Sequence, residues 1–197
     1  YMLLAMTLIF SAVTTTLSVF LKLPPMTYLL SLGGAIVLMW FVLPRTANSI
    51  SGIGVVFGIT GLLGLGLGPL LSMYLSLPNG PQIVATALGG TGVIFFALSG
   101  YALTTRRNFN FMGGFLATGF LVVLAASLVN IFLGIPAFSL AISATVVMLM
   151  SGFLLYETSQ MVHGGQDNYV LATVGLYMTI FNLFVSLLHL LGFASND

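Results

Sequence analysis

Seven long apolar stretches, separated by short clusters of helix-breaking or charged residues, dominate this chain of 197 residues. About 20 consecutive apolar residues cross the hydrocarbon core of a bilayer as an α-helix, and the stretches are of about this length. The separators are rich in Pro, Gly, Asn or charge, which end helices and form turns. We predict seven transmembrane helices at residues 1–22, 26–43, 52–75, 82–104, 111–133, 137–162 and 169–192.

The stretches are continuously apolar, whereas the strands of a membrane barrel alternate apolar and polar residues over about ten positions. Helices that satisfy their own backbone hydrogen bonds are therefore the expected structure. The short connections make consecutive helices antiparallel neighbours. We expect an all-α bundle of seven transmembrane helices that forms a single domain over residues 1–197 in the lipid bilayer.

Charge and cysteine content exclude several classes of function. Only 4% of the residues are charged, against about 25% in soluble domains, so a soluble globule of this composition could not cover its surface. The net charge of +1 provides no basic surface for nucleic acid. The absence of cysteine removes disulfides, thiolate nucleophiles and Cys-type metal sites, and two histidines are few for a metal centre. We expect no metal and no cofactor.

The distribution of basic residues predicts the orientation of the chain. With strictly alternating spans, Arg45, Arg106 and Arg107 share one side with the N-terminus, and Lys22 stands alone on the other. By the positive-inside rule the N-terminus is cytoplasmic, and the C-terminus lies in the periplasm of a Gram-negative host. The expected location is the bacterial inner membrane. Because the chain begins at Tyr1 without a basic region, we expect a preceding native segment and no signal peptide at residues 1–20.

The third predicted helix is rich in glycine. Gly54 and Gly58, and again Gly64 and Gly68, form small-xxx-small pairs, which allow helix backbones to approach closely. Tight helix packing is the favoured interpretation. Pro69 follows this run and predicts a kink or local unwinding. A broken helix of the transporter type is the alternative, and the absence of a visible internal repeat weakens it.

Glu157 is the only acid inside a predicted span, and an ionisable group in hydrocarbon needs a partner, a proton or water. It lies six positions before His163, which places it about 9 Å below the cytoplasmic end at about 1.5 Å per residue. Arg45 enters from the same side, so an ion pair is geometrically allowed, with Arg106 or Arg107 as substitutes. The alternatives are a titrating gate or proton site, and a carboxylate that reaches the interface.

The seventh predicted helix carries a polar face. Five small or polar residues recur there at steps of four, three, four and three: Gly175, Thr179, Asn182, Ser186 and His189. Such spacing places them on one side of a helix, which must turn toward neighbouring helices and away from lipid. Hydrogen bonding between helices is the favoured role. A hydrated proton or ion path, with Glu157 near one end and His189 near the other, is the alternative.

No constellation of catalytic residues is visible, and we predict that the protein is not an enzyme. An intramembrane serine protease would need a nucleophile beside a base; Ser99 and His189 are the nearest candidates, but no Gly-x-Ser-Gly motif is present. Aspartyl chemistry needs two carboxylates at one site. A His-Glu-x-x-His zinc motif is also absent.

Dispersed motifs over nearly the whole chain resemble the Bax inhibitor (TMBIM) family of seven-helix membrane proteins, and its bacterial YccA-type branch in particular. The motifs include Ala87-Leu88-Gly89-Gly90-Thr91, Tyr156-Glu157-Thr158-Ser159, His163-Gly164-Gly165 and Asn182-Leu183-Phe184. The resemblance implies six helices around a central seventh. It also implies a membrane-embedded regulator that associates with the AAA+ protease FtsH, near its partners HflK and HflC, and restrains degradation of membrane proteins.

The same family includes pH-sensitive calcium leak proteins, whose sensor is a pair of acids on helices six and seven beside an arginine. In this chain Glu157 matches the helix-six acid, Thr179 occupies the helix-seven position, and Arg45 approximately matches the arginine. A lone carboxylate lacks the repulsion that makes two acids share a proton. Calcium, which prefers six to eight oxygen ligands, is poorly served by one acid. The alternative function that the resemblance implies is a pH-sensitive calcium or proton leak channel gated at Glu157, and proton sensitivity needs only this acid.

Overall fold

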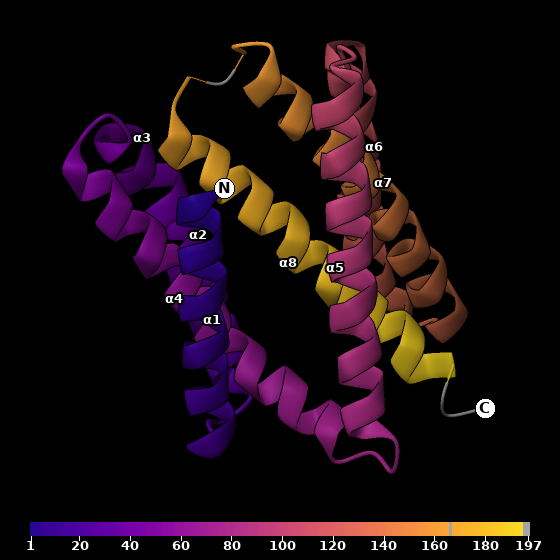
Figure 1. The fold of residues 1–197 in the computed structure, drawn as a ribbon. Coiled ribbons are helices and arrows are strands. Elements are labelled where there is room, and N and C mark those ends of the chain that lie inside the picture. The colour runs from indigo at the N-terminus through magenta and orange to yellow at the C-terminus, as the bar shows by residue number, and fades with distance from the viewer. Residues whose placement is uncertain (166, 195–197) are drawn as a thin grey trace. The chain divides into compact units, whose positions relative to one another are not determined.

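A computed structural model describes residues 1–165 and 167–194 of the chain, and within these ranges all regular structure is helical (Figure 1). The elements in chain order are α1 (Met2–Phe20), α2 (Met26–Val37), η1 (Leu38–Val42), α3 (Leu43–Thr46), α4 (Ile50–Leu75), α5 (Gly80–Thr105), η2 (Asn110–Met112), α6 (Gly113–Leu133), α7 (Pro136–Val162) and α8 (Tyr169–Ala194). Seven helices are long and apolar enough to cross a membrane, the second being the continuous run Met26–Thr46. The prediction of seven membrane helices is confirmed.

The chain divides into two compact units. Unit 1 comprises Tyr1–Gly80 and Asn168–Tyr177, and unit 2 comprises Pro81–Asp167 and Met178–Asp197. Helix α8 therefore gives its first residues to unit 1 and the rest to unit 2. The single domain, the central position of the last helix and the orientation in the membrane stay predictions.

Local sequence explains where the helices begin and end. Helix α6 ends at Gly134, whose positive φ of 62° suits a residue without a Cβ, and its N–H donates to the carbonyl of Asn130 at 2.8 Å. Pro136 then occupies the first turn of α7, where its missing N–H leaves no intrahelical bond unmade. At the start of α8, the Asn168 side chain accepts hydrogen bonds from the N–H groups of Val170 and Leu171.

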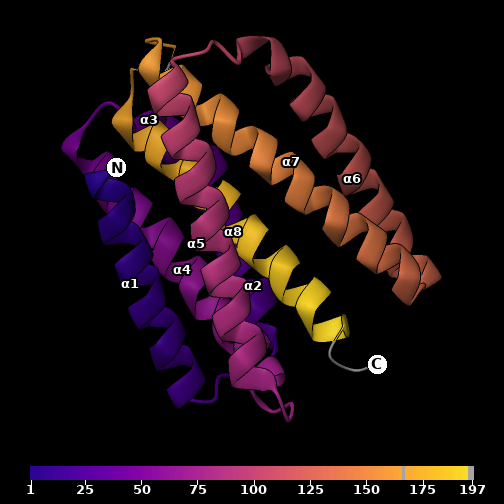
Figure 2. The ribbon, with the colours of Figure 1, turned by 45° about the vertical axis from the view of Figure 1, so that its right-hand side comes forward.

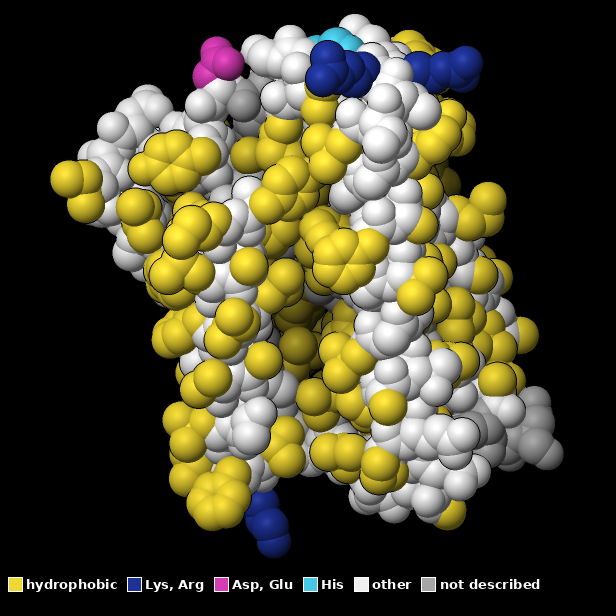
Figure 3. Space-filling view, in the orientation of Figure 1, with side chains coloured by type: hydrophobic (Ala, Val, Ile, Leu, Met, Phe, Trp, Pro, Cys, Tyr) yellow, Lys and Arg dark blue, Asp and Glu magenta, His cyan; other side chains and the backbone are white. Residues whose placement is uncertain are grey.

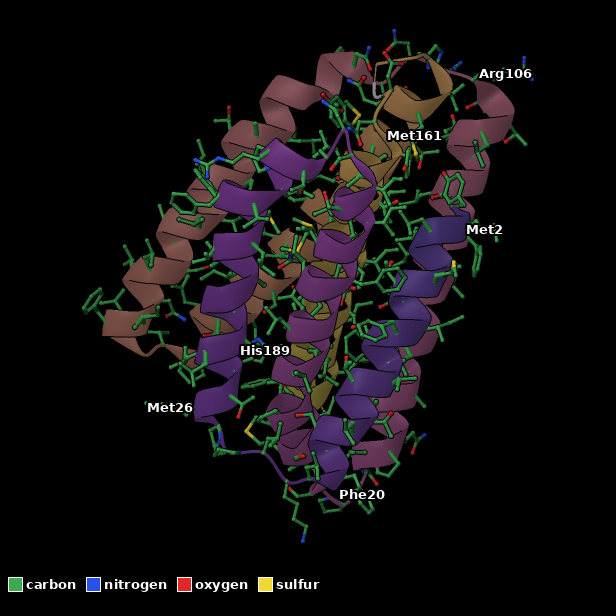
Figure 4. The ribbon with its side chains drawn as sticks, turned by 90° about the vertical axis from the view of Figure 1, so that its left-hand side faces the viewer. Met2, Phe20, Met26, Arg106, Met161 and His189 are labelled. Carbon is green, nitrogen blue, oxygen red and sulfur yellow. The ribbon has the colours of Figure 1, made fainter. Side chains whose placement is uncertain are left out.

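In unit 1, α4 packs against both α1 and α2. The buried face of α1 is mostly polar and contains Leu4, Thr7, Ser11, Thr15 and Ser18. Large apolar side chains, Met2 and Phe20 among them, point outward at the two ends of α1 (Figure 4). Small polar residues inside and large apolar residues outside are the arrangement expected where the solvent is lipid and close helix contact relies on small residues.

The two glycine pairs of α4 differ in what surrounds them. A methyl group on Gly64 would collide with Thr14 and Ser11 of α1, and one on Gly68 would collide with Ser18. At Gly54, in contrast, a methyl group would meet no heavy atom within 4 Å, and at Gly58 it would lie 3.3 Å from Leu38. Close backbone approach between α1 and α4 thus depends on the second pair.

Of the kink or local unwinding expected at Pro69, the unwinding is absent, because α4 is helical from Ile50 to Leu75, and the kink stays a prediction. Proline lacks the N–H that would bond to the carbonyl four residues earlier, which here belongs to Leu65. The Ser18 hydroxyl of α1 donates to that Leu65 carbonyl at 2.7 Å. A neighbouring helix therefore supplies the missing donor, as proline in a membrane helix requires.

The second membrane helix contains a π turn that sequence reasoning missed. Over η1 the backbone widens, and the N–H of Leu43 donates to the carbonyl of Leu38, five residues earlier. Pro44 follows directly and cannot donate, which favours such a local irregularity. The helix continues to Thr46.

In unit 2, α6 and α7 run side by side (Figure 2). Their contact uses small residues, since a methyl group on Gly119 would lie 2.7 Å from Leu149, and one on Gly152 would lie 2.7 Å from Leu116. Most of α6 is exposed otherwise: in the span Asn110–Leu133, only 6% of the residues in the apolar stretch are buried. Figure 3 shows hydrophobic side chains along the flanks of the helices and charged side chains at helix ends, the pattern of a lipid-facing surface.

Candidate functional site

The acid predicted to carry chemistry, Glu157, lies in α7 and is partly buried. The hydroxyl of Thr179 on α8 donates to its carboxylate at 2.9 Å, and Thr179 itself is only 4% exposed. Both residues belong to unit 2. A hydrogen bond from a hydroxyl stabilises a carboxylate that has little access to water. The pair therefore forms the centre of a polar site between α7 and α8.

A second polar contact adjoins this pair. The hydroxyl groups of Ser99 on α5 and Thr158 on α7 lie 3.3 Å apart, and Thr158 is fully buried. Because Thr158 directly follows Glu157, the polar site extends from α8 across α7 to α5. Sequence reasoning considered Ser99 only as a nucleophile and missed this contact.

His189 bonds to a residue that sequence reasoning did not single out. Its Nδ1 lies 2.7 Å from the hydroxyl of Ser143 on α7, and that hydroxyl also lies 3.0 Å from the carbonyl oxygen of Ser139. The tautomer of the imidazole decides which of the two side chains donates in the contact between His189 and Ser143. This contact joins α8 to α7.

The polar face of α8 contributes unequally to these contacts. Thr179 and His189 reach α7, whereas the side-chain amide of Asn182 donates to the carbonyl of Met178 on its own helix at 2.8 Å. Ser186 is buried and Gly175 partly buried. The predicted face therefore turns inward, with two of its members bonded to a neighbouring helix. The hydrated path along it stays a prediction.

The arginines are all exposed at helix ends. Arg45 is in α3 of unit 1, whereas Glu157 is in unit 2, so their ion pair stays a prediction. Arg106 and Arg107 follow α5 with exposed side chains, and their carbonyl groups accept hydrogen bonds from the end of α7. The carboxylate of Glu157 thus has a neutral hydroxyl as its donor within unit 2.

Unit 1 contains a buried hydroxyl cluster that sequence reasoning also missed. The Tyr177 phenol lies 2.6 Å from the hydroxyl of Ser11 and donates to the carbonyl of Thr60 at 3.4 Å. Thr15 donates to the carbonyl of Gly64 at 2.8 Å. The signal was available in α1, where Thr7, Ser11, Thr15 and Ser18 recur at steps of four, four and three.

The start of α8 is fastened to unit 1 by Asn168 as well. Its side-chain amide donates to the carbonyl of Ala47 at 3.0 Å and to the side chain of Asn48 at 2.7 Å, while its oxygen caps α8. One asparagine therefore both begins the helix and connects it to the turn between α3 and α4. None of these groups changes charge near neutral pH.

Chemically, the membrane-spanning helices of unit 2 offer one carboxylate, one imidazole and several hydroxyls among their described residues. Among residues 1–165 and 167–194, no three His, Cys, Asp or Glu side chains gather in a way that holds a metal ion. A carboxylate bonded to a hydroxyl can accept and release one proton. The site therefore suits proton exchange or helix pairing.

Comparison with known proteins gives a consistent relationship over the full chain. A family described as "Inhibitor of apoptosis-promoting Bax1" matches residues 1–196. The Escherichia coli K12 protein named "Modulator of FtsH protease YccA" is 50% identical over 197 residues, which cover 100% of this chain and 89% of the relative. The same identity and coverage hold for "Inner membrane protein YccA" of Escherichia coli O6:H1. A Vibrio cholerae membrane protein is 43% identical over 100% of this chain and 88% of the relative. The resemblance deduced from dispersed motifs is confirmed, and the chain belongs to the Bax1-I (Bax inhibitor) family.

Proposed function

We propose that this protein is a non-enzymatic modulator, resident in the bacterial inner membrane, that binds an FtsH-type protease and restrains its degradation of membrane proteins. The observation that carries the proposal is the 50% identity over the whole chain with a relative named a modulator of that protease. The relative's name concerns that protein, and the proposal extends it to this chain.

The structure supports action through membrane helices. Seven apolar helices take up most of the chain, and the connections between them are a few residues long. A protein built this way presents mainly helix surfaces to a partner, and α6 is the most exposed of them. Binding between membrane helices relies on packing and a few polar contacts, which such surfaces provide. HflK and HflC are proposed as neighbouring members of the same assembly.

Co-purification from native membranes tests binding directly. We expect a tagged copy, solubilised in mild detergent, to recover FtsH, with HflK and HflC retained at low salt. Deletion of the gene is expected to shorten the half-life of a membrane substrate of FtsH, and overproduction to lengthen it. A tagged multi-pass protein of similar abundance controls for non-specific recovery. Absence of FtsH from the eluate together with unchanged substrate half-lives would remove the proposal.

A second candidate function is a proton or cation leak gated at Glu157. The observation that favours it is the hydrogen bond between Thr179 and the carboxylate of Glu157 inside the membrane-spanning helices. Opening such a contact exposes an acid to solvent and creates a charged position within a span. Membrane-buried acids of this kind serve as proton and ion sites.

Flux through proteoliposomes separates the two candidates. If the leak exists, wild-type protein gives a pH-dependent proton or calcium flux that Glu157→Gln abolishes. Asp167→Asn, which removes an exposed acid after α7, is the matched control and keeps the flux. Equal flux from wild type and Glu157→Gln, or none from either, contradicts the leak. Wild-type substrate half-lives with Glu157→Gln would show that modulation is independent of this acid.

A further inference from the structure

The loop between α5 and α6 is fastened to the C-terminal end of α7 by His163. The ring atom Nε2 lies 2.9 Å from the carbonyl oxygen of Arg106, and Nδ1 lies 2.9 Å from the carbonyl oxygen of Ser159. All three residues belong to unit 2. In Figure 4, Arg106 lies at the same end of unit 2 as Met161, in the last turn of α7.

The two contacts have a chemical requirement that a neutral histidine cannot meet. A carbonyl oxygen only accepts hydrogen bonds, so each ring nitrogen must donate. A neutral imidazole has one N–H, and its other nitrogen would direct a lone pair at a carbonyl lone pair. The Ser159 hydroxyl does not provide the missing donor, because it lies 3.4 Å from Nδ1 and donates to the carbonyl of Arg107 at 3.2 Å. Both contacts are hydrogen bonds only when the ring carries two protons.

We infer that His163 is a proton-dependent clasp, which holds the α5–α6 loop against α7 when the imidazole is protonated and releases it when the proton leaves. Histidine is the side chain that ordinarily gains or loses a proton between pH 5 and 8. His163 is exposed, so protons reach it from solvent.

The α5–α6 loop has an unusual backbone conformation at the residue that His163 contacts. Arg106 has a positive φ of 48°, a left-handed conformation that residues other than glycine disfavour. Hydrogen bonding of its carbonyl to His163 stabilises this turn. The loop is also tied by Ser159, whose hydroxyl accepts from the N–H of Phe109 at 3.0 Å. The Ser159 contacts do not depend on pH, so release of His163 loosens the loop without detaching it.

Charged groups around the clasp act in both directions. The guanidinium groups of Arg106 and Arg107 are exposed on the loop and repel an imidazolium, whereas the carboxylate of Asp167 attracts it. The C-terminal end of α7, which is the negative end of the helix dipole, also favours a cation. Tyr156 and Glu157 are the other titratable groups on the last turns of α7, and the Glu157 carboxylate is bonded to Thr179. Helix η2, which packs on α7, has no charged residue.

Amide hydrogen exchange of the protein in lipid nanodiscs, corrected for the intrinsic pH dependence of exchange, tests the clasp. We expect the protection of residues 105–112 to fall about ten-fold between pH 5.5 and 8, the effect of losing one charge-assisted hydrogen bond. His163→Gln should show the low protection at every pH. The matched control His189→Gln changes the other histidine and keeps the wild-type fall. Ser159→Ala should lower protection at every pH and keep the pH dependence.

Two results overturn the inference. One is wild-type protection of residues 105–112 that does not change with pH, and the other is an unchanged fall in His163→Gln. Nitrogen-15 spectra of histidine-labelled wild-type protein give a measurement that needs no His163 variant. Two N–H nitrogens on the His163 ring at pH 5.5, and one at pH 8, are expected. A ring with a single N–H at pH 5.5 contradicts the clasp.

Discussion

Glycine packing and neutral hydrogen bonds join helices in both units of this protein, and unit 2 adds titratable side chains to these contacts. In unit 1 the contacts are glycine packing and neutral hydrogen bonds, such as those of Ser18 with Leu65 and Tyr177 with Ser11. In unit 2 the carboxylate of Glu157 and the imidazole of His189 take part. Helix α8 contributes to both, with Tyr177 in one unit and Thr179 in the other. Among the hydrogen bonds between helices described above, those that involve a carboxylate or an imidazole therefore lie in unit 2.

The largest effect expected from a single methyl group is at Gly68. Gly68→Ala places a Cβ against Ser18, and we expect it to lower the free energy of unfolding by about 2 kcal/mol, typical of overpacking. The measurement is the unfolding midpoint in detergent at pH 5.5 and pH 8, which should shift equally. Gly54→Ala is the control with open space at its Cβ, and should be neutral or stabilising by up to about 1 kcal/mol. Equal losses from both variants would contradict the role of the second glycine pair.

The hydrogen bond between Ser18 and Leu65 should show the next largest effect. Ser18→Ala leaves the partly buried carbonyl of Leu65 without this donor, and we expect a loss of about 1.5 kcal/mol in the free energy of unfolding, again at either pH. Pro69→Ala restores an N–H that can donate to the same carbonyl. The double variant should therefore recover much of the loss, and a double-mutant cycle in detergent measures the coupling. If the free-energy changes of the two single variants simply add in the double variant, the Ser18 hydroxyl does not replace the N–H that Pro69 lacks.

Thr179→Val tests the contrast between the units. Removing the hydroxyl leaves the Glu157 carboxylate without its donor, and we expect a loss of about 1 kcal/mol in the free energy of unfolding. Because hydrogen bonds to a charged carboxylate are stronger than those to a protonated one, the loss should shrink as the pH falls. Unfolding midpoints across a pH series check this, and in the Glu157→Gln background the dependence should vanish. If the loss in the free energy of unfolding does not change with pH, this contact behaves like the neutral hydrogen bonds of unit 1.

The smallest expected effect is that of Tyr177→Phe. The hydroxyl is lost while the aromatic ring remains. We therefore expect the free energy of unfolding to fall by about 0.6 kcal/mol, the average for hydrogen bonds between membrane helices. The same unfolding titration at pH 5.5 and pH 8 should give one value. A loss that changes over this range would show that unit 1 senses protons as well, and would end the distinction between the units.

The continuous apolar stretches and the breaker clusters between them were enough to predict seven helices and most of their ends. Breaker clusters such as Gly134 to Pro136 set helix boundaries locally. Glycine allows a backbone conformation that ends a helix, and proline fixes φ and lacks the N–H of a helix interior. The last helix could likewise be assigned a polar, inward face from spacing alone. Glu157 was identifiable because a charge within a span is rare and costly.

Sequence by itself determined that this chain crosses a membrane, which family it belongs to, and which residues are unusual for a lipid environment. Tertiary structure decided the partners: Thr179 for Glu157, Ser143 for His189, and Ser18 for the carbonyl that Pro69 leaves free. Periodicity reports which side of a helix a residue occupies, whereas a hydrogen bond depends on the depth and rotation of a second helix. Those quantities are set by the packing of the helices, as the contrast between open Gly54 and crowded Gly68 shows.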